Sequence, residues 1–227
     1  MSGGGYAYPI IIGPIVIGSG YSDQDSASTD PPEPSPQMLS LNPPIGVEMT
    51  PRGGSFDMQP QIESDWCWAA VAASINNYLD PHPDATVGGT WDQYSIATAV
   101  LVQEMQWNPP VNCSKDPNQM CDVPARLDTA LSVTKNLAPD GARVNCYLDF
   151  ASIRNWLNQL LPVGARMLWP SGGAHFIVLS GYQEFDDGSQ LVLVQDPLYG
   201  PSFQDFDALQ GHYLYGGSWQ DTYLVAP

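Results

Sequence analysis

Apolar and small side chains recur at helical spacing in the segment SDWCWAAVAASINNYL, which begins at Ser64. Intervals of three and four residues are the period of one face of an α-helix. Ser64 or Asp65 is available as the N-cap, and Pro81 ends the pattern. Similar patterns predict three further helices, at residues 91–106, 124–132 and 151–161, the third of these four helices opening with a proline in its first turn.

The pattern then changes to short apolar runs bounded by Gly, Pro and Asp. Four of these runs are typical of β-strands: ARMLW (165–169), HFIVLSGY (175–182), LVLVQD (191–196) and WQDTYLV (219–225). The DDGS sequence between the second and third runs favours a tight turn, which would make those two strands an antiparallel hairpin. Helices followed by antiparallel strands predict an α+β fold, with a helical half, a sheet half and a cleft between them.

Residues 1–54 differ in composition from the rest of the chain. They contain an apolar run, PIIIGPIVI (9–17), followed by a Pro-, Ser-, Asp- and Gly-rich stretch that buries too little apolar surface to order itself. The run is too short to span a membrane, and residues 1–51 lack the Lys or Arg of a standard signal peptide. We interpret 1–54 as an arm, either a pro-segment or a passive or secretion-related extension, and 55–227 as the globular domain.

Charge and cysteine content narrow the function classes. Seven Lys and Arg against 24 Asp and Glu give a net charge of −17, which repels nucleic acids and anionic lipids. Cys113 and Cys121 flank a short polar loop and are expected to form a disulfide, which leaves Cys146 as an odd thiol. No His or Cys stands near that pair at zinc-ligand spacing, so we expect no metal site and no cofactor.

Cys67 stands where the first predicted helix begins. A thiol there meets the positive end of the helix dipole and free backbone amides, which favour the thiolate, the nucleophilic form. Gln61, six residues earlier, is close enough in sequence for its side-chain amide to form an oxyanion hole with the Cys67 backbone amide. Gln59 is a rival for that role. Taken alone, a cysteine in a helix is more often a buried structural residue than a nucleophile.

Two residues of the predicted hairpin complete a catalytic set. His175 heads one strand directly after a glycine-rich turn, and Asp196 ends the next strand. If the two strands pair antiparallel, Asp196 lies beside His175 and can orient its imidazole as the third member of a triad. The remaining histidines, His82 and His212, are expected in exposed loops.

The blocks QIESDWCWAAVAASINNYL, GGAHFIVLSGY and LVLVQDP together resemble the papain-like cysteine peptidases. More narrowly, they resemble the bacterial branch that contains the bacteriocin-leader peptidases and the secreted effector proteases of plant pathogens. The resemblance covers about residues 61–197, with WQDTYLV as a fourth block. It implies a two-lobed papain-like fold with the active site between the lobes, and it implies the oxyanion, nucleophile, base and orienting roles for Gln61, Cys67, His175 and Asp196.

Three departures separate the sequence from eukaryotic papain relatives. Only Cys67-Trp68 remains of the usual cysteine signature, and the third catalytic member is Asp instead of Asn. His175 follows Cys67 by 108 residues, fewer than the roughly 130 to 150 of the papain pattern. All three departures favour the compact bacterial branch.

The sequence therefore predicts a cysteine endopeptidase acting on a protein or peptide substrate. Two alternatives remain. An acyl transferase would use the same residues but pass the acyl group to an amine instead of water, and a deamidase would use them to hydrolyse a side-chain amide instead of a peptide bond. A catalytically silent binding module would share only the papain-like fold. We expect no nucleic-acid partner, no membrane span, and secretion or export from a bacterium by a non-standard route, with a cytoplasmic location left open. Oligomeric state is not predicted.

Overall fold

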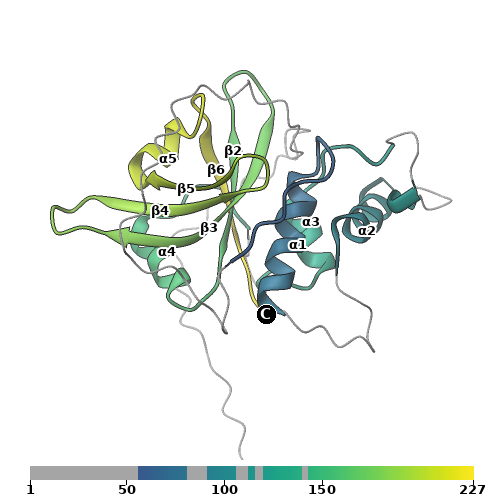
Figure 1. Ribbon diagram of the computed structural model, residues 1–227, viewed down its shortest axis with the longest axis horizontal. Helices are drawn as coiled ribbons and strands as arrows, with labels where there is room; N and C mark the ends of the chain where they lie inside the picture. The colour runs from purple at the N-terminus through teal and green to yellow at the C-terminus, as the bar shows by residue number, and fades with distance from the viewer. Residues whose placement is uncertain (1–55, 81–90, 106–111, 116–119, 140–142) are drawn as a thin grey trace, which may run out of the picture.

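The computed structural model describes residues 56–80, 91–105, 112–115, 120–139 and 143–227 (Figure 1). A helical part is followed by a six-stranded antiparallel sheet with helices packed on it, so the predicted α+β class is confirmed. The arm at 1–54 and the loop holding His82 lie outside the described residues. The helices are α1 (Cys67–Leu79), α2 (Gln93–Met105), α3 (Leu127–Val133), α4 (Phe150–Leu157) and α5 (Phe206–His212), with a short 3-10 helix η2 (Cys113–Lys115).

Helix α1 is the buried centre of the helical part. Its many alanines present little side-chain bulk, which lets α2, α3 and the sheet pack closely against it (Figure 1). The helix begins at Cys67 as predicted, but neither Ser64 nor Asp65 caps it. Trp66 occupies the N-cap position and makes no side-chain cap hydrogen bond. The local sequence alone therefore leaves the amino end of α1 without a cap.

The sheet runs in the order β1-β6-β2-β3-β4-β5, and every neighbouring pair is antiparallel. Its strands are β1 (Arg143–Val144), β2 (Val163–Leu168), β3 (Ala174–Glu184), β4 (Gln190–Asp196), β5 (Gly200–Asp205) and β6 (Ser218–Leu224). The predicted hairpin between β3 and β4 is confirmed. Gly188 in its turn has φ +88°, a left-handed conformation that glycine adopts without strain.

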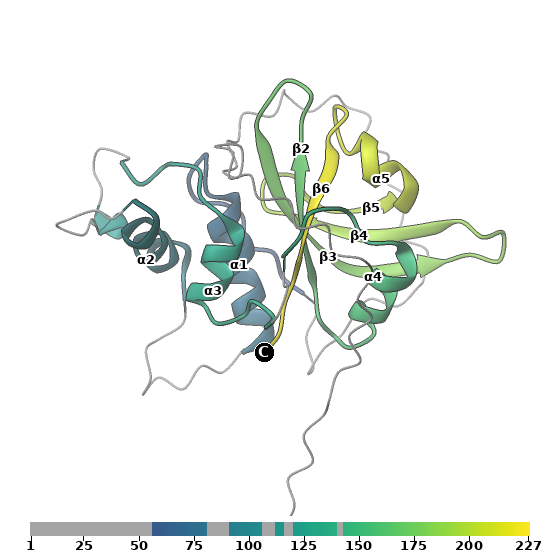
Figure 2. The same cartoon turned by 180° about the vertical axis from the view of Figure 1, so that it is seen from behind.

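Side chains that alternate along β3 divide between two hydrophobic cores. Phe176 and Val178 pack with α1, α2 and α3, whereas Ile177 and Leu179 pack with α4 and α5. Seen from behind, α4 and α5 lie on the sheet, away from the three helices of the helical part (Figure 2). A strand buried on both faces explains why HFIVLSGY is almost continuously apolar.

Several predicted boundaries were wrong. Helix α3 begins at Leu127, so Pro124 lies before the helix and not in its first turn. Helix α4 ends at Leu157, and Leu160 adopts a left-handed φ of +61° that a helix cannot accommodate. His212 is exposed as predicted, but it is the last residue of α5, not a loop residue.

Four elements were not predicted: the 3-10 helix η2, strands β1 and β5, and helix α5. Strand β1 has only two residues, and β5 opens with Gly200-Pro201, which weakens any strand pattern. The amino end of α5 is defined by Asp205, whose carboxylate accepts a hydrogen bond from the Ala208 backbone N–H at 2.8 Å. Within the described residues, no helix is long and apolar enough to cross a membrane.

Candidate active site

The predicted residues Cys67, His175 and Asp196 come from three elements that meet where α1 packs against the sheet. Cys67 is the first residue of α1, His175 the second of β3 and Asp196 the last of β4. Because β3 and β4 are antiparallel, the start of one strand lies beside the end of the other. The His175 Nε2 donates a hydrogen bond of 2.9 Å to the Asp196 Oδ1, as the sequence predicted.

The Asp196 carboxylate is buried and accepts four hydrogen bonds. Its Oδ1 accepts the imidazole and the backbone N–H groups of Leu198 and Tyr199, at 2.7 and 3.0 Å. Its Oδ2 accepts the Tyr213 hydroxyl at 2.6 Å. Burial opposes ionisation, but His175 and these donors outweigh it and lower the pKa of Asp196. A charged carboxylate with a fixed orientation results.

His175 is completely buried, and burial alone would lower the pKa of its imidazole. The negative charge and hydrogen bond of Asp196, together with an interaction with Cys67, reverse that effect and raise the pKa of His175 to about 10. The second ring nitrogen, Nδ1, has no hydrogen-bond partner of standard geometry among the described residues. The imidazole is therefore held by Asp196 at one nitrogen, and the thiol of Cys67 is near enough to influence its charge.

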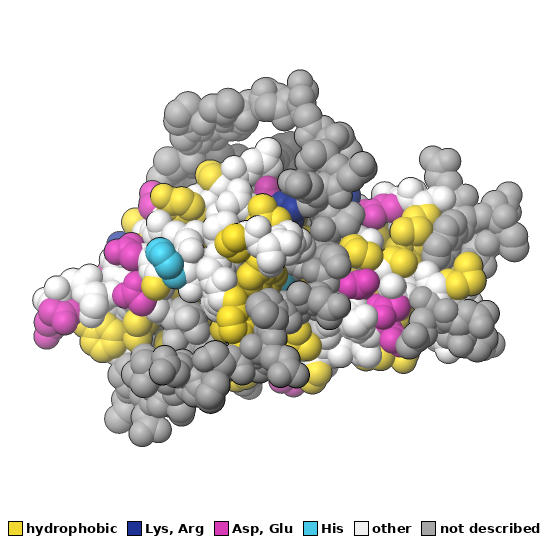
Figure 3. Space-filling view, turned by 90° about the horizontal axis from the view of Figure 1, so that it is seen from above, with side chains coloured by type: hydrophobic (Ala, Val, Ile, Leu, Met, Phe, Trp, Pro, Cys, Tyr) yellow, Lys and Arg dark blue, Asp and Glu magenta, His cyan; other side chains and the backbone are white. Residues whose placement is uncertain are grey.

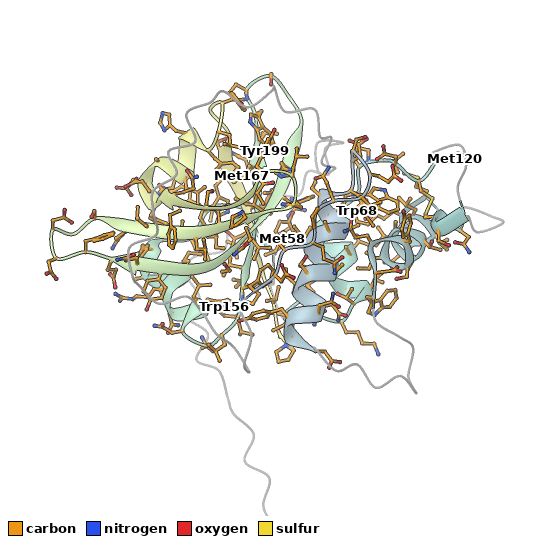
Figure 4. The ribbon with its side chains drawn as sticks, in the orientation of Figure 1. Met58, Trp68, Met120, Trp156, Met167 and Tyr199 are labelled. Atoms are coloured by element: carbon orange, nitrogen blue, oxygen red, sulfur yellow. A yellow bond between two sulfur atoms is a disulfide. The ribbon has the colours of Figure 1, made fainter. Side chains whose placement is uncertain are left out.

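Two aromatic side chains pack beside the imidazole. The ring centroids of Trp169 and Tyr199 lie 5.9 and 6.4 Å from that of His175. Figure 4 labels Tyr199, which lies in the turn between β4 and β5, and Met167, the β2 partner of His175 in the strand register. It also labels Trp68, which follows Cys67, on helix α1. Trp169 and Tyr199 restrict the rotation of the His175 ring, and the imidazole is 0% exposed.

Gln61 lies in the segment that leads into α1. Its backbone N–H donates to the Pro197 carbonyl at 3.0 Å, which ties this segment to the residue after Asp196. The side-chain Nε2 donates to the backbone carbonyls of Glu63 and Ser64, at 3.1 and 2.7 Å, so both amide hydrogens are engaged. An oxyanion role for Gln61 would require one of these two bonds to be exchanged for the substrate oxygen.

The rival glutamine is committed elsewhere. Gln59 donates its backbone N–H to the Ser74 hydroxyl, two turns into α1, and its side-chain oxygen accepts a hydrogen bond from Gln93 of α2. The Gln59 side chain thus contacts α2, which favours Gln61 as the oxyanion donor. The backbone N–H of Cys67 itself, in the first turn of α1, has no acceptor within the helix.

Tyr213 is a site residue that the sequence analysis missed. Its buried hydroxyl donates to Asp196, and its backbone forms an isolated two-way bridge with Gly217, with N···O distances of 2.9 and 2.7 Å. A Cβ on Gly217 would lie 2.9 Å from the Tyr213 carbonyl oxygen, so only glycine fits this bridge. The Gly216-Gly217 pair was the one available sequence signal, and it did not point to Asp196.

No group of three or more His, Cys, Asp or Glu side chains suited to hold a metal ion occurs among the described residues.

The predicted disulfide between Cys113 and Cys121 is present, with Cα atoms 5.6 Å apart, and Cys146 is free and exposed. Acidic side chains greatly outnumber basic ones on the face shown in Figure 3, over both the helical part and the sheet. Cys67 is free and buried, and it interacts with His175.

Comparison of the sequence with models of known protein families gives no match, and comparison with curated protein sequences gives none either. The chemistry of the site therefore rests on its own geometry.

Proposed function

We propose that this protein is a papain-like cysteine peptidase that cleaves peptide bonds with Cys67 as nucleophile, His175 as acid and base, and Asp196 as the residue that orients His175. One observation supports the proposal above all. The buried imidazole of His175 is hydrogen-bonded to the Asp196 carboxylate through Nε2, and its Nδ1 has no other hydrogen-bond partner of standard geometry. The imidazole interacts with Cys67, the only buried free cysteine of the described residues. This is the arrangement in which a histidine can exchange a proton with a thiol.

The reaction begins from the Cys67 thiolate and the His175 imidazolium. The sulfur forms a bond to the peptide carbonyl carbon, and the carbonyl electron pair moves to the oxygen, which the Cys67 backbone N–H and Gln61 stabilise. The C–N bond then breaks, and the proton of His175 passes to the leaving amine nitrogen. Water attacks the thioester while His175 takes a proton from it, and Cys67 leaves as the thiolate.

Asp196 stays ionised throughout this cycle. Its carboxylate stabilises the imidazolium and fixes the ring with Nε2 toward the sheet, which leaves Nδ1 for Cys67. The helical part supplying the nucleophile and the sheet supplying the base agree with a two-lobed papain-like architecture. The Cys113–Cys121 disulfide favours an oxidising compartment and so supports secretion or export.

Labelling with an epoxide inhibitor of cysteine peptidases, E-64, tests the proposal. Mass mapping of the wild-type protein should find the adduct on Cys67 and not on Cys146, although Cys146 is the exposed thiol. Cys67→Ala and His175→Ala should abolish labelling and peptide hydrolysis, while Cys146→Ala should retain both. Adducts on Cys146 alone, or unchanged hydrolysis by Cys67→Ala, would refute the assignment.

A further inference from the structure

The residues on both sides of Cys67 are bonded to one short segment, Cys121–Val123, that follows the disulfide. The indole Nε1 of Trp66 donates to the Cys121 carbonyl at 2.7 Å, and that of Trp68 donates to the Val123 carbonyl at 3.2 Å. The Cys67 backbone is thus held from both neighbours by a segment more than 50 residues later in sequence.

Asp122, in the middle of that segment, is bonded to the chain just before α1. Its Oδ1 accepts the backbone N–H of Asp65 at 2.8 Å, and its Oδ2 accepts the hydroxyl of Ser64 at 2.6 Å. Helix α1 has no side-chain cap of its own. The carboxylate of Asp122 therefore orders the turn before the helix from outside, at the end where a negative charge is stabilised.

The same turn connects the oxyanion candidate to the nucleophile. The Gln61 side chain donates to the Ser64 carbonyl, and Ser64 is bonded through its hydroxyl to Asp122. Displacement of this turn would move Gln61 and the amino end of α1 together. Asp122 does not contact Cys67, so any effect on the reaction passes through the turn.

The segment holding Asp122 is itself anchored at two points. Cys121 is joined by its disulfide to Cys113, and the Cys113 backbone N–H donates to the Thr98 hydroxyl on α2 at 3.0 Å. Figure 4 shows Met120, the residue before Cys121, in the helical part with Trp68. The disulfide and the hydrogen bond to α2 restrain the segment that holds Asp122, so its carboxylate can fix the position of the turn at residues 64–66.

From these contacts we propose that Asp122 is a positioning residue for Cys67, a proposal that rests on the proposed function. It holds the turn at residues 64–66 so that the sulfur of Cys67 and the oxyanion donors keep their places relative to His175. The Cys113–Cys121 disulfide restrains the segment that holds Asp122.

The test measures the rate at which iodoacetamide alkylates Cys67 in the full-length protein, with the exposed Cys146 as an internal reference in each sample. In Asp122→Ala the ratio of the two rates should fall about tenfold, the effect of losing two hydrogen bonds that order the reacting group. Asp122→Asn keeps an acceptor for Asp65 and a polar partner for Ser64, so its ratio should stay within about threefold of the wild type.

Asp92→Ala is the matched control, because Asp92 also accepts one backbone N–H and one serine hydroxyl, both from Ser95 of α2. Its ratio should remain close to the wild-type value. An unchanged ratio in Asp122→Ala, or an equal fall in Asp92→Ala, would overturn the inference. Ser64→Ala removes one of the two bonds at an exposed residue and should lower the ratio about threefold even if Asp122→Ala fails to fold.

The experiment also separates the two proposals. Wild-type Cys67 reacting no faster than Cys146 would overturn the proposed function and the positioning role together. A reactive wild-type Cys67 with an insensitive Asp122→Ala variant would overturn only the positioning role.

Discussion

Four hydrogen-bond donors converge on the Asp196 carboxylate, and only one of them, His175, was predictable from the sequence. His175 and Asp196 stand at strand ends joined by a recognisable turn, so strand pairing alone places them together. Tyr213 reaches the same carboxylate through a loop bridge with Gly217, and no local pattern encodes that contact. The members of the proposed triad stand at the ends of strands and a helix and can therefore be predicted from the sequence, whereas a supporting residue such as Tyr213 cannot.

Removal of the Tyr213 hydroxyl should weaken both the fold and the triad. Tyr213→Phe leaves the buried Asp196 Oδ2 without its donor, so we expect about 1 to 3 kcal/mol less unfolding free energy. The rate of Cys67 labelling by E-64 should also fall. Tyr182→Phe is the control, because it removes a hydroxyl whose bond to Asn158 is exposed to solvent. Equal effects in the two variants in urea unfolding would contradict the special role of Tyr213.

The raised pKa of His175 predicts how stability depends on pH. An imidazole with a pKa of about 10 in the folded state, against 6.5 unfolded, contributes its full stabilisation below pH 6.5 and loses it as the pH rises toward 10. The lowered pKa of Asp196 has the opposite sign, so its contribution is present near neutral pH and is lost only on acidification.

Urea unfolding at several pH values between 6 and 10 checks this dependence. The free energy of unfolding of the wild type should decrease across that range more steeply than that of His175→Ala, which lacks the titrating group. Tyr199 and Tyr78, with pKa values raised to about 12, affect stability only above the ordinary tyrosine pKa of 10. Parallel curves for the two proteins would show that His175 is not charged in the folded state.

Gln61 is expected to act in the transition state, because its amide must exchange a backbone carbonyl for the substrate oxygen. Gln61→Ala should lower kcat by roughly a hundred- to a thousandfold, the usual loss for one oxyanion donor. Gln59→Ala should have little effect on kcat, because the Gln59 side chain contacts Gln93 of α2. Steady-state hydrolysis of a peptide substrate decides between them, and the reverse order of effects would transfer the role to Gln59.

At the scale of elements, strongly periodic segments were predicted and short irregular ones were not. Helix α1 and the β3–β4 hairpin agree with the sequence analysis to within a few residues, because each buries a clear apolar pattern. Strand β5 exists because it extends the sheet beside β4, which is a tertiary cause that its own Gly200-Pro201 start conceals. The prediction of Ser64 or Asp65 as the N-cap of α1 was wrong for the same reason, because Asp122, from another part of the chain, is bonded to both of these residues.

Strands β1, β2 and β6 are joined by a largely buried ion network that no periodicity predicts. Asp221 of β6 accepts hydrogen bonds from Arg166 of β2 at 2.8 Å and from Arg143 of β1 at 3.1 Å. Arg143 also approaches Asp128 of α3, at 4.0 Å, which links the sheet to the helical part. Burying these charges is tolerated only because each is paired.

Breaking this network at Asp221 should be severely destabilising. Asp221→Ala leaves the buried Arg166 without its carboxylate partner and removes the closer partner of Arg143, so we expect a loss of about 3 to 5 kcal/mol in unfolding free energy. Glu184→Ala removes the partner of Arg154 in a solvent-exposed pair and should cost far less. Thermal unfolding of the two variants side by side compares them, and similar losses would mean that the network at Asp221 is no stronger than a surface pair.

Across the whole molecule, the helical part and the sheet each supply a part of the proposed catalytic site. The proposed nucleophile, Cys67, belongs to α1, and the proposed acid-base pair, His175 and Asp196, belongs to β3 and β4, so the site forms only when the two parts pack together. Cys67 and His175 are both 0% exposed, and a substrate cannot reach them without displacement of surrounding atoms.

The arm at residues 1–54 lies outside the described residues, but its sequence suggests that it is removed by the protein itself. Its apolar run, its Pro- and Ser-rich stretch and the Arg52-Gly53-Gly54 sequence before the domain are typical of a pro-segment joined by a cleavable tether. If the proposed peptidase cuts its own tether, purified wild-type protein should lose an N-terminal piece ending near Gly54, and the rate of Cys67 labelling should rise afterwards. The Cys67→Ala protein, incubated in parallel, should stay intact because it lacks the nucleophile. Intact-mass spectra over time distinguish the outcomes, and equal trimming of both proteins, or trimming of neither, would favour a passive arm or a secretion address.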